Sequence, residues 1–75
     1  MKTCTVLLSS INEVKNFVNI VSKYDCEIDL TSGRYVVDAK SIMGIFSLDL
    51  SKPITVEIHS DDCANVLEDL KPYIQ

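Results

Sequence analysis

Two separated stretches of the chain alternate polar and apolar residues with a period of two, and this pattern constrains the fold most strongly. In residues 25–30 (DCEIDL), a cysteine, an isoleucine and a leucine point to one side and three acidic residues to the other. Residues 54–60 (ITVEIHS) repeat the pattern. Such alternation is typical of strands with one packed face and one wet face. We therefore expect a sheet that is covered on one side.

The remaining pattern predicts helices that can cover this sheet. Residues 2–8 alternate and end in two serines, which predicts a strand followed by a helix cap. Steps of three and four then predict a helix that runs to about Ser22 or Lys23. Its apolar stripe consists of Ile11, Val14, Phe17, Val18 and Val21.

The second half of the chain adds a hairpin and two further helices. Thr31-Ser32-Gly33 is turn chemistry, and Tyr35 to Val37 form the returning strand. A short helix follows Ser41, and a last helix begins at Asp61 or Asp62 and ends near Pro72. The order is strand, helix, strand, strand, helix, strand, helix (βαββαβα). It predicts an α+β two-layer sandwich with a largely antiparallel sheet.

Composition narrows the functional classes. With 75 residues, we expect a single domain over 1–75. A net charge of −4 and scattered basic residues exclude a non-specific nucleic-acid binder. No apolar run approaches the roughly 20 residues that span a bilayer, and we read no signal peptide. We expect a monomer in the cytoplasm.

The number and spacing of the cysteines are also consistent with the cytoplasm. Cys4, Cys26 and Cys63 are widely spaced, without a C-x-x-C motif, and the chain has one histidine. We therefore expect no metal site, and no cofactor is indicated. The thiols are interpreted as small apolar side chains in a reducing compartment, with one redox-active cysteine or a disulfide as alternatives.

The segment KYDCEIDL, a turn that contains glycine, and KSIMGIFSLDL (residues 40–50) together resemble the HPr family. These are small phosphocarrier proteins of the phosphoenolpyruvate-dependent sugar phosphotransferase system. The resemblance implies an open-faced β-sandwich, with a four-stranded antiparallel sheet covered on one face by three helices. The resemblance also implies that the protein is not itself an enzyme. It also implies two sites, a histidine that carries phosphate at the start of the first helix and, in many Gram-positive members, a serine phosphorylated by an ATP-dependent kinase.

The sequence departs from the family at the first of these sites. Counted back without a gap, the family's phosphohistidine position falls on Ser10, its arginine position on Asn12 and the following proline on Glu13. A serine phosphoester transfers its phosphate far less readily than a phosphoimidazole. Ser10 to Glu13 instead read as an S-x-x-E capping box, in which Ser10 accepts from a helix amide and Glu13 reaches back to the cap. Its carboxylate would repel an anion there.

The second site is retained. Ser41 matches the family's regulatory serine and precedes a short apolar helix, where its hydroxyl is also well placed as an N-cap and Lys40 adds a local cation. The helix is too short to bury all its apolar residues, so some should form an exposed docking patch. The candidate docking residues are Ile42, Met43, Ile45 and Phe46. The implied partners are HPr kinase, other phosphotransferase-system proteins or a transcriptional co-regulator.

Three hypotheses follow. The first is a regulatory or interaction protein of sugar transport that acts through Ser41 as a phosphoprotein and has lost phosphocarrier activity. The second is a phosphocarrier with an unconventional acceptor, Ser10 or His59, although His59 is also interpreted as an ordinary surface histidine. The third is a structural binding module without phosphorylation.

Overall fold

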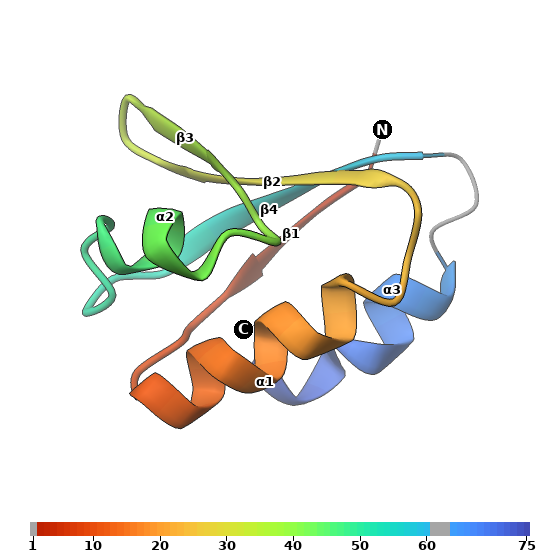
Figure 1. The fold of residues 1–75 in the computed structure, drawn as a ribbon, viewed down its shortest axis with the longest axis horizontal. Helices are drawn as coiled ribbons and strands as arrows, with labels where there is room; N and C mark the ends of the chain where they lie inside the picture. Colours follow the sequence, from red (N-terminus) through yellow and green to blue (C-terminus); the bar gives the residue numbers. More distant parts are fainter. Residues whose placement is uncertain (1, 61–63) are drawn as a thin grey trace.

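The computed structural model describes residues 2–60 and 64–75, which form one sheet and the helices that cover it (Figure 1). The elements are β1 (Lys2–Val6), α1 (Ile11–Val21), β2 (Glu27–Ser32), β3 (Tyr35–Asp38), α2 (Ile42–Phe46), β4 (Ile54–His59), α3 (Ala64–Asp69) and a 3-10 turn, η1 (Lys71–Tyr73). The predicted element order is confirmed. The cap proposed at Asp61 or Asp62 lies outside the described residues.

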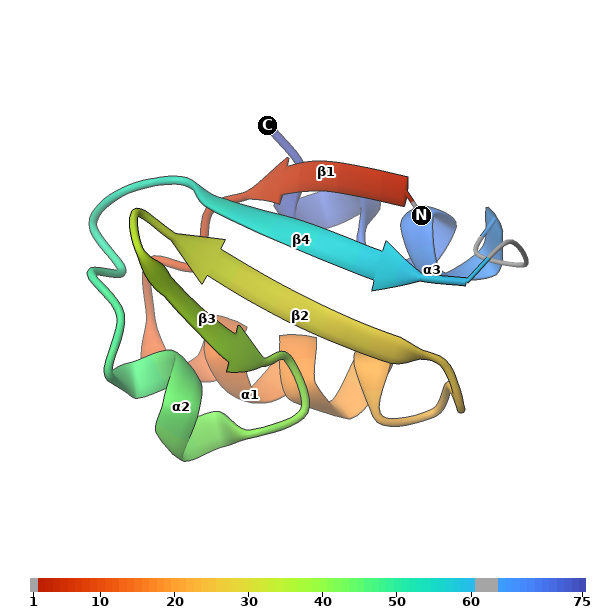
Figure 2. The same cartoon turned by 90° about the horizontal axis from the view of Figure 1, so that it is seen from above.

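The sheet has four strands in the order β1-β4-β2-β3, and every neighbouring pair is antiparallel. Helices α1 and α3 lie beneath it, while α2 lies beside β3 (Figures 1 and 2). Within residues 2–60 and 64–75, no helix lies on the other face of the sheet (Figure 1). The expected open-faced arrangement of four antiparallel strands and three helices is therefore confirmed.

The core lies between the sheet and the helices. Alternate residues of β4, Ile54, Val56 and Ile58, are fully buried, as their spacing predicts. These three side chains belong to one hydrophobic cluster that includes residues of α1, α3 and β2 and of the segment after α3. They are Val14, Phe17 and Val21 of α1, Ile28 and Leu30 of β2, Val66 of α3, and Leu70, which directly follows α3. The opposite side chains of β2 and β4 consequently face away from the helices.

Some predicted boundaries were wrong. The strand predicted at 25–30 runs from Glu27 to Ser32, because Thr31 and Ser32 pair with β3. The turn is formed by Gly33 and Arg34, and Gly33 has a φ of +60°, which glycine adopts without strain. The first strand ends at Val6, and the first helix ends at Val21 rather than at Ser22 or Lys23.

Ile11 was wrongly placed in the apolar stripe of α1. Its side chain is 62% exposed, whereas Val14, Phe17 and Val21 are buried. Ile11 is the first helical residue, and its position on the periodic stripe does not bring it over the sheet. It leaves an apolar side chain available at the surface.

Candidate functional site

Ser41 caps α2 as the sequence predicts. Its backbone is extended (φ −100°, ψ 105°), and its Oγ accepts a hydrogen bond from the backbone N–H of Gly44 at 3.2 Å. The residue is exposed. The serine hydroxyl thus lies at the start of a helix, beside backbone donors of the first turn, and is open to solvent.

Gly44 allows the backbone to approach closely at this cap. A Cβ built on Gly44 would lie 3.3 Å from both Ser41 Oγ and Val37 Cβ, which is tighter than ordinary van der Waals contact. The sequence alone could not separate this role from that of lowering helix propensity. The structure supports close approach, because the helix start packs directly against β3.

The charges near Ser41 are arranged differently from the sequence expectation. The Lys40 ammonium donates to the backbone carbonyl of Tyr24 at 2.6 Å, so this cation holds the connection between α1 and β2. Asp38 accepts from the backbone N–H of Lys40 at 2.8 Å. Asp49 accepts from the hydroxyl and backbone N–H of Ser51, and the hydroxyl hydrogen bond is the main cause that lowers the pKa of Asp49. Both carboxylates therefore stabilise local turns.

The apolar residues of α2 divide between the surface and the core. Met43 is 78% exposed and Phe46 is 40% exposed, while Ile42 is half-buried. Ile45 is fully buried, so its assignment to the docking surface was wrong. With four positions on so short a helix, one must point to the sheet, and packing selects Ile45. We call Ile42, Met43 and Phe46 the α2 patch.

Ser10 caps α1. Its Oγ accepts from the backbone N–H of Glu13 at 3.1 Å, which is the predicted first half of a capping box. The Glu13 carboxylate accepts from the hydroxyls of Ser9 at 2.8 Å and Ser10 at 3.4 Å. Glu13 thus reaches back toward the cap, as predicted, and its carboxylate contacts serine hydroxyls there. Asn12 is exposed on the first turn.

The only histidine of the sequence lies far from this helix start. Val6, which leads into α1, pairs with Ile54 at the beginning of β4, whereas His59 ends that strand. Five steps of strand separate Ile54 from His59 by about 16 Å. His59 also alternates with the buried Ile58, so its side chain points to the face without helices. The imidazole of His59 therefore lies away from the start of α1.

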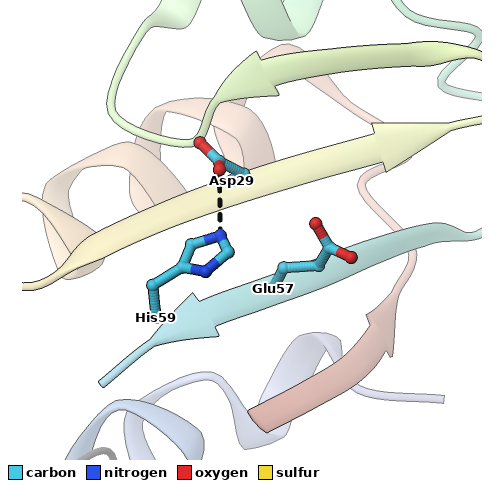
Figure 3. Close-up of side chains that lie close together, drawn as sticks. All are labelled: Asp29, Glu57 and His59. Atoms are coloured by element: carbon cyan, nitrogen blue, oxygen red, sulfur yellow. Dashed lines mark hydrogen bonds and ion pairs between the residues drawn. The ribbon is translucent and has the colours of Figure 1, made fainter. Parts of the chain in front are cut away.

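His59 belongs instead to a cluster that the sequence analysis missed. Its Nε2 lies 3.0 Å from Oδ2 of Asp29 on β2, and Glu57 is beside them (Figure 3). The alternation of β4 does indicate that Glu57 and His59 share a face. Asp29 could be added only with the register between β2 and β4, which the sequence does not reveal.

The two cysteines among the described residues are free thiols that pack at the edge of the core. Burial raises the pKa of the Cys4 thiol, so its reactive thiolate is disfavoured. This supports the interpretation of Cys4 as a small apolar side chain. Cys63 lies outside the described residues. No helix in the described part of the chain has the length and apolarity needed to cross a membrane.

Comparison with known proteins gives a consistent group of relatives. The family model described as "PTS HPr component phosphorylation site" matches residues 12–75, a range that begins after Ser10. The chain is similar to the structure of HPr-C-His from Thermoanaerobacter tengcongensis, at 28% identity and a TM-score of 0.81, covering 96% of this chain and 89% of that one. Curated proteins gave no significant match.

Two further solved structures are similar. The phosphocarrier protein HPr from Bacillus anthracis has 28% identity and a TM-score of 0.74, covering 99% of this chain and 96% of that one. Crh, described as the Bacillus subtilis catabolite repression containing protein and as a dimer with a swapped domain, has 28% identity and a TM-score of 0.68. That comparison covers 93% of this chain and 80% of Crh.

Proposed function

The chain belongs to the HPr family of phosphotransferase-system proteins, and from this premise we propose that it regulates sugar transport through Ser41 and does not carry phosphate. Phosphorylation of Ser41 by an ATP-dependent kinase would control whether the α2 patch binds a partner. That partner would be another phosphotransferase-system protein or a transcriptional co-regulator in the cytoplasm.

The observation that carries the proposal is the exposed Ser41 hydroxyl directly beside an exposed apolar surface. Met43 is the most exposed of the large apolar side chains described. A phosphate on Ser41 would add nearly two negative charges and three acceptor oxygens next to this patch. Such a change alters the chemistry of a docking surface without requiring the fold to change.

The start of α1 supports the loss of phosphocarrier activity. Ser10 Oγ is engaged by the Glu13 amide, and the Glu13 carboxylate lies within reach of the same hydroxyl. A phosphoryl group here would meet a negative charge, and a serine phosphoester would hold it too firmly for onward transfer. Crh is a similar protein whose description refers to catabolite repression, and it offers a precedent for a regulatory role on this fold.

The alternative acceptors are less well supported. Ser10 has the chemical disadvantages above. His59 lies at the opposite end of β4 from Ile54, which pairs with Val6 where β1 leads into α1, and its side chain points to the face of the sheet away from the core. A partner that docks at the starts of α1 and α2 would not reach it. A purely structural binding module remains the third hypothesis, in which the α2 patch binds independently of Ser41.

The deciding experiment offers the purified protein two phosphate donors separately. One sample receives HPr kinase and ATP, and the other receives enzyme I and phosphoenolpyruvate; intact mass and site mapping follow. We expect one phosphate on Ser41 from ATP and none from phosphoenolpyruvate. Ser41→Ala should abolish the modification, and the matched variant Ser47→Ala, at the other end of α2, should retain it.

Other outcomes distinguish the hypotheses. Acid-labile phosphate on His59, or phosphate from phosphoenolpyruvate on Ser10, would establish an unconventional phosphocarrier. If neither donor modifies the protein, and the Ser41→Asp variant binds a partner in a pull-down as well as the original protein does, the chain is a structural binding module.

A further inference from the structure

The face of the sheet without helices brings together three side chains with metal-ligating atoms. Asp29 pairs directly with Glu57 across β2 and β4, and His59 follows Glu57 by two residues. All three therefore point to the same side, away from the core (Figure 3). They are held on adjacent, hydrogen-bonded strands, and strands position side chains more firmly than loops do.

The distances within this group, which we call the sheet-face triad, are short. Nε2 of His59 lies 3.0 Å from Oδ2 of Asp29, and one ligand atom from each residue lies within 4.8 Å of the others. Zinc binds imidazole nitrogen and carboxylate oxygen at about 2.0–2.2 Å, which places neighbouring ligands about 3.3 Å apart. Small side-chain rotations would bring the three atoms to that spacing.

Burial favours a defined site over loose surface charges. Asp29 and Glu57 are half-buried, while His59 is exposed, with 36% of its side chain accessible. The surrounding sheet consequently restricts the rotation of the two carboxylates. The hydrogen bond between Asp29 and His59 further holds the imidazole toward the carboxylates.

The flanking charges would attract a cation. Glu27 pairs with His59, and Asp38 pairs with Asp29, so the register places two more acidic residues beside the triad. Imidazole is a poor ligand for magnesium and calcium, which prefer oxygen, and a good one for zinc. Three protein ligands leave the fourth tetrahedral position to water.

We propose that Asp29, Glu57 and His59 form a zinc-binding site on the open face of the sheet. Zinc would take the lone pair of His59 Nε2, with the ring proton on Nδ1, and would replace the hydrogen bond to Asp29 by coordination to both residues. This site is independent of Ser41 and the α2 patch. It differs from the expectation of no metal site, which rested on the missing C-x-x-C motif and the single histidine and did not consider carboxylates joined to that histidine by strand register.

Because the chain has a single histidine, its imidazole nitrogens can be observed directly. Nitrogen-15-labelled protein without an affinity tag would be titrated with zinc chloride, and the ring signals followed by long-range ¹H–¹⁵N correlation. We expect the His59 Nε2 signal to shift and to saturate at one equivalent of zinc. Magnesium chloride should produce no such shift.

Variants test whether the three residues act together. Asp29→Asn and Glu57→Gln should each weaken zinc binding by about tenfold or more, since loss of even an outer-shell partner costs that much. Glu27→Gln is the matched control, because it removes a charge from the same face without removing a proposed ligand. It should weaken binding by no more than about twofold, since an exposed charge outside the site is screened by salt.

Amide spectra of each variant would show that the sheet is intact. An unshifted His59 ring signal at millimolar zinc would overturn the proposal. Equal weakening by Glu27→Gln and Asp29→Asn would also overturn it, because diffuse attraction would then explain binding. Unchanged affinity in both Asp29→Asn and Glu57→Gln would mean that the histidine binds zinc alone.

Discussion

At the scale of single residues, serine hydroxyls cap the starts of α1 and α2. Ser10 and Ser41 each accept from the backbone N–H three residues later, which satisfies one of the donors that a helix leaves unpaired. The Ser10 hydroxyl that caps α1 lies beside the carboxylate of Glu13. In Ser41 the hydroxyl is beside an apolar surface, and the same cap is therefore also a candidate modification site.

Removing the first cap should measurably destabilise the fold. We expect Ser10→Ala to lower the free energy of unfolding by about 1 kcal/mol, because the Glu13 amide loses its partner. Urea denaturation followed by circular dichroism would measure the loss. Ser10→Asp, which keeps a capping oxygen, is the control, and equal stabilities of the alanine and aspartate variants would contradict the capping role.

Tyr24 provides a titration test of a second local contact. Its hydroxyl donates to the Asp69 carboxylate, and this hydrogen bond is the main cause that raises the pKa of Tyr24. A raised folded pKa means that the contact stabilises the fold below the usual tyrosine pKa and is lost as pH rises through the folded value.

The variant Asp69→Asn should consequently lower the pKa of Tyr24 toward its ordinary value. Tyrosine ring-carbon NMR shifts between pH 8 and pH 12 would record the titration, because the assigned Tyr24 signal reports its own ionisation. Glu68→Gln, which removes a neighbouring carboxylate that pairs with Lys71, is the matched control. An unchanged Tyr24 titration in Asp69→Asn would show that the hydrogen bond does not control it.

At the scale of elements, α2 combines one core residue with an exposed patch. Ile45 is fully buried, whereas Met43 two positions earlier is mostly exposed. We expect Ile45→Ala to lower the free energy of unfolding by about 2–5 kcal/mol. Met43→Ala should change it by no more than about 0.5 kcal/mol. Urea denaturation of both variants gives the comparison, and similar losses would mean that α2 packs differently.

The elements also show which features a sequence can predict. The strand predicted within residues 54–60 is present as β4, one residue shorter, because strict alternation reports burial on one face. Thr31 and Ser32 were mistaken for turn residues, because their polarity suits a turn and only pairing with β3 shows them to be strand. The Asp29–His59 contact joins two strands distant in sequence. Its prediction would have required strand register, and alternation does not determine register between strands.

At the scale of the whole molecule, the last residues close one edge of the sheet. Ile74 forms a bridge with Val6, Gln75 donates its backbone N–H to the carbonyl of Thr5 at 3.0 Å, and Leu7 donates to the carbonyl of Tyr73 at 3.0 Å. These contacts occupy backbone groups that an edge strand would otherwise leave open to another chain.

Gln75→Pro removes one of these donors without shortening the chain. We expect it to lower the free energy of unfolding by about 1 kcal/mol, the usual net contribution of one hydrogen bond. Gln75→Ala keeps the backbone N–H and should match the original protein. Thermal or urea unfolding of the two variants would test this, and identical stabilities would show that the edge contact contributes nothing.

The central place of β4 in the sheet has a consequence for the order of folding. β1 and β2 are not neighbours, and each pairs with β4, which comes later in the chain than both. Lys2, for example, cannot form its strand pair until Ile58 has been synthesised. During synthesis, the β2–β3 hairpin and α1 can form early, but β1 has no strand to pair with until residues 54–59 have left the ribosome. Assembly of the sheet is then a late event, which depends on contacts distant in sequence.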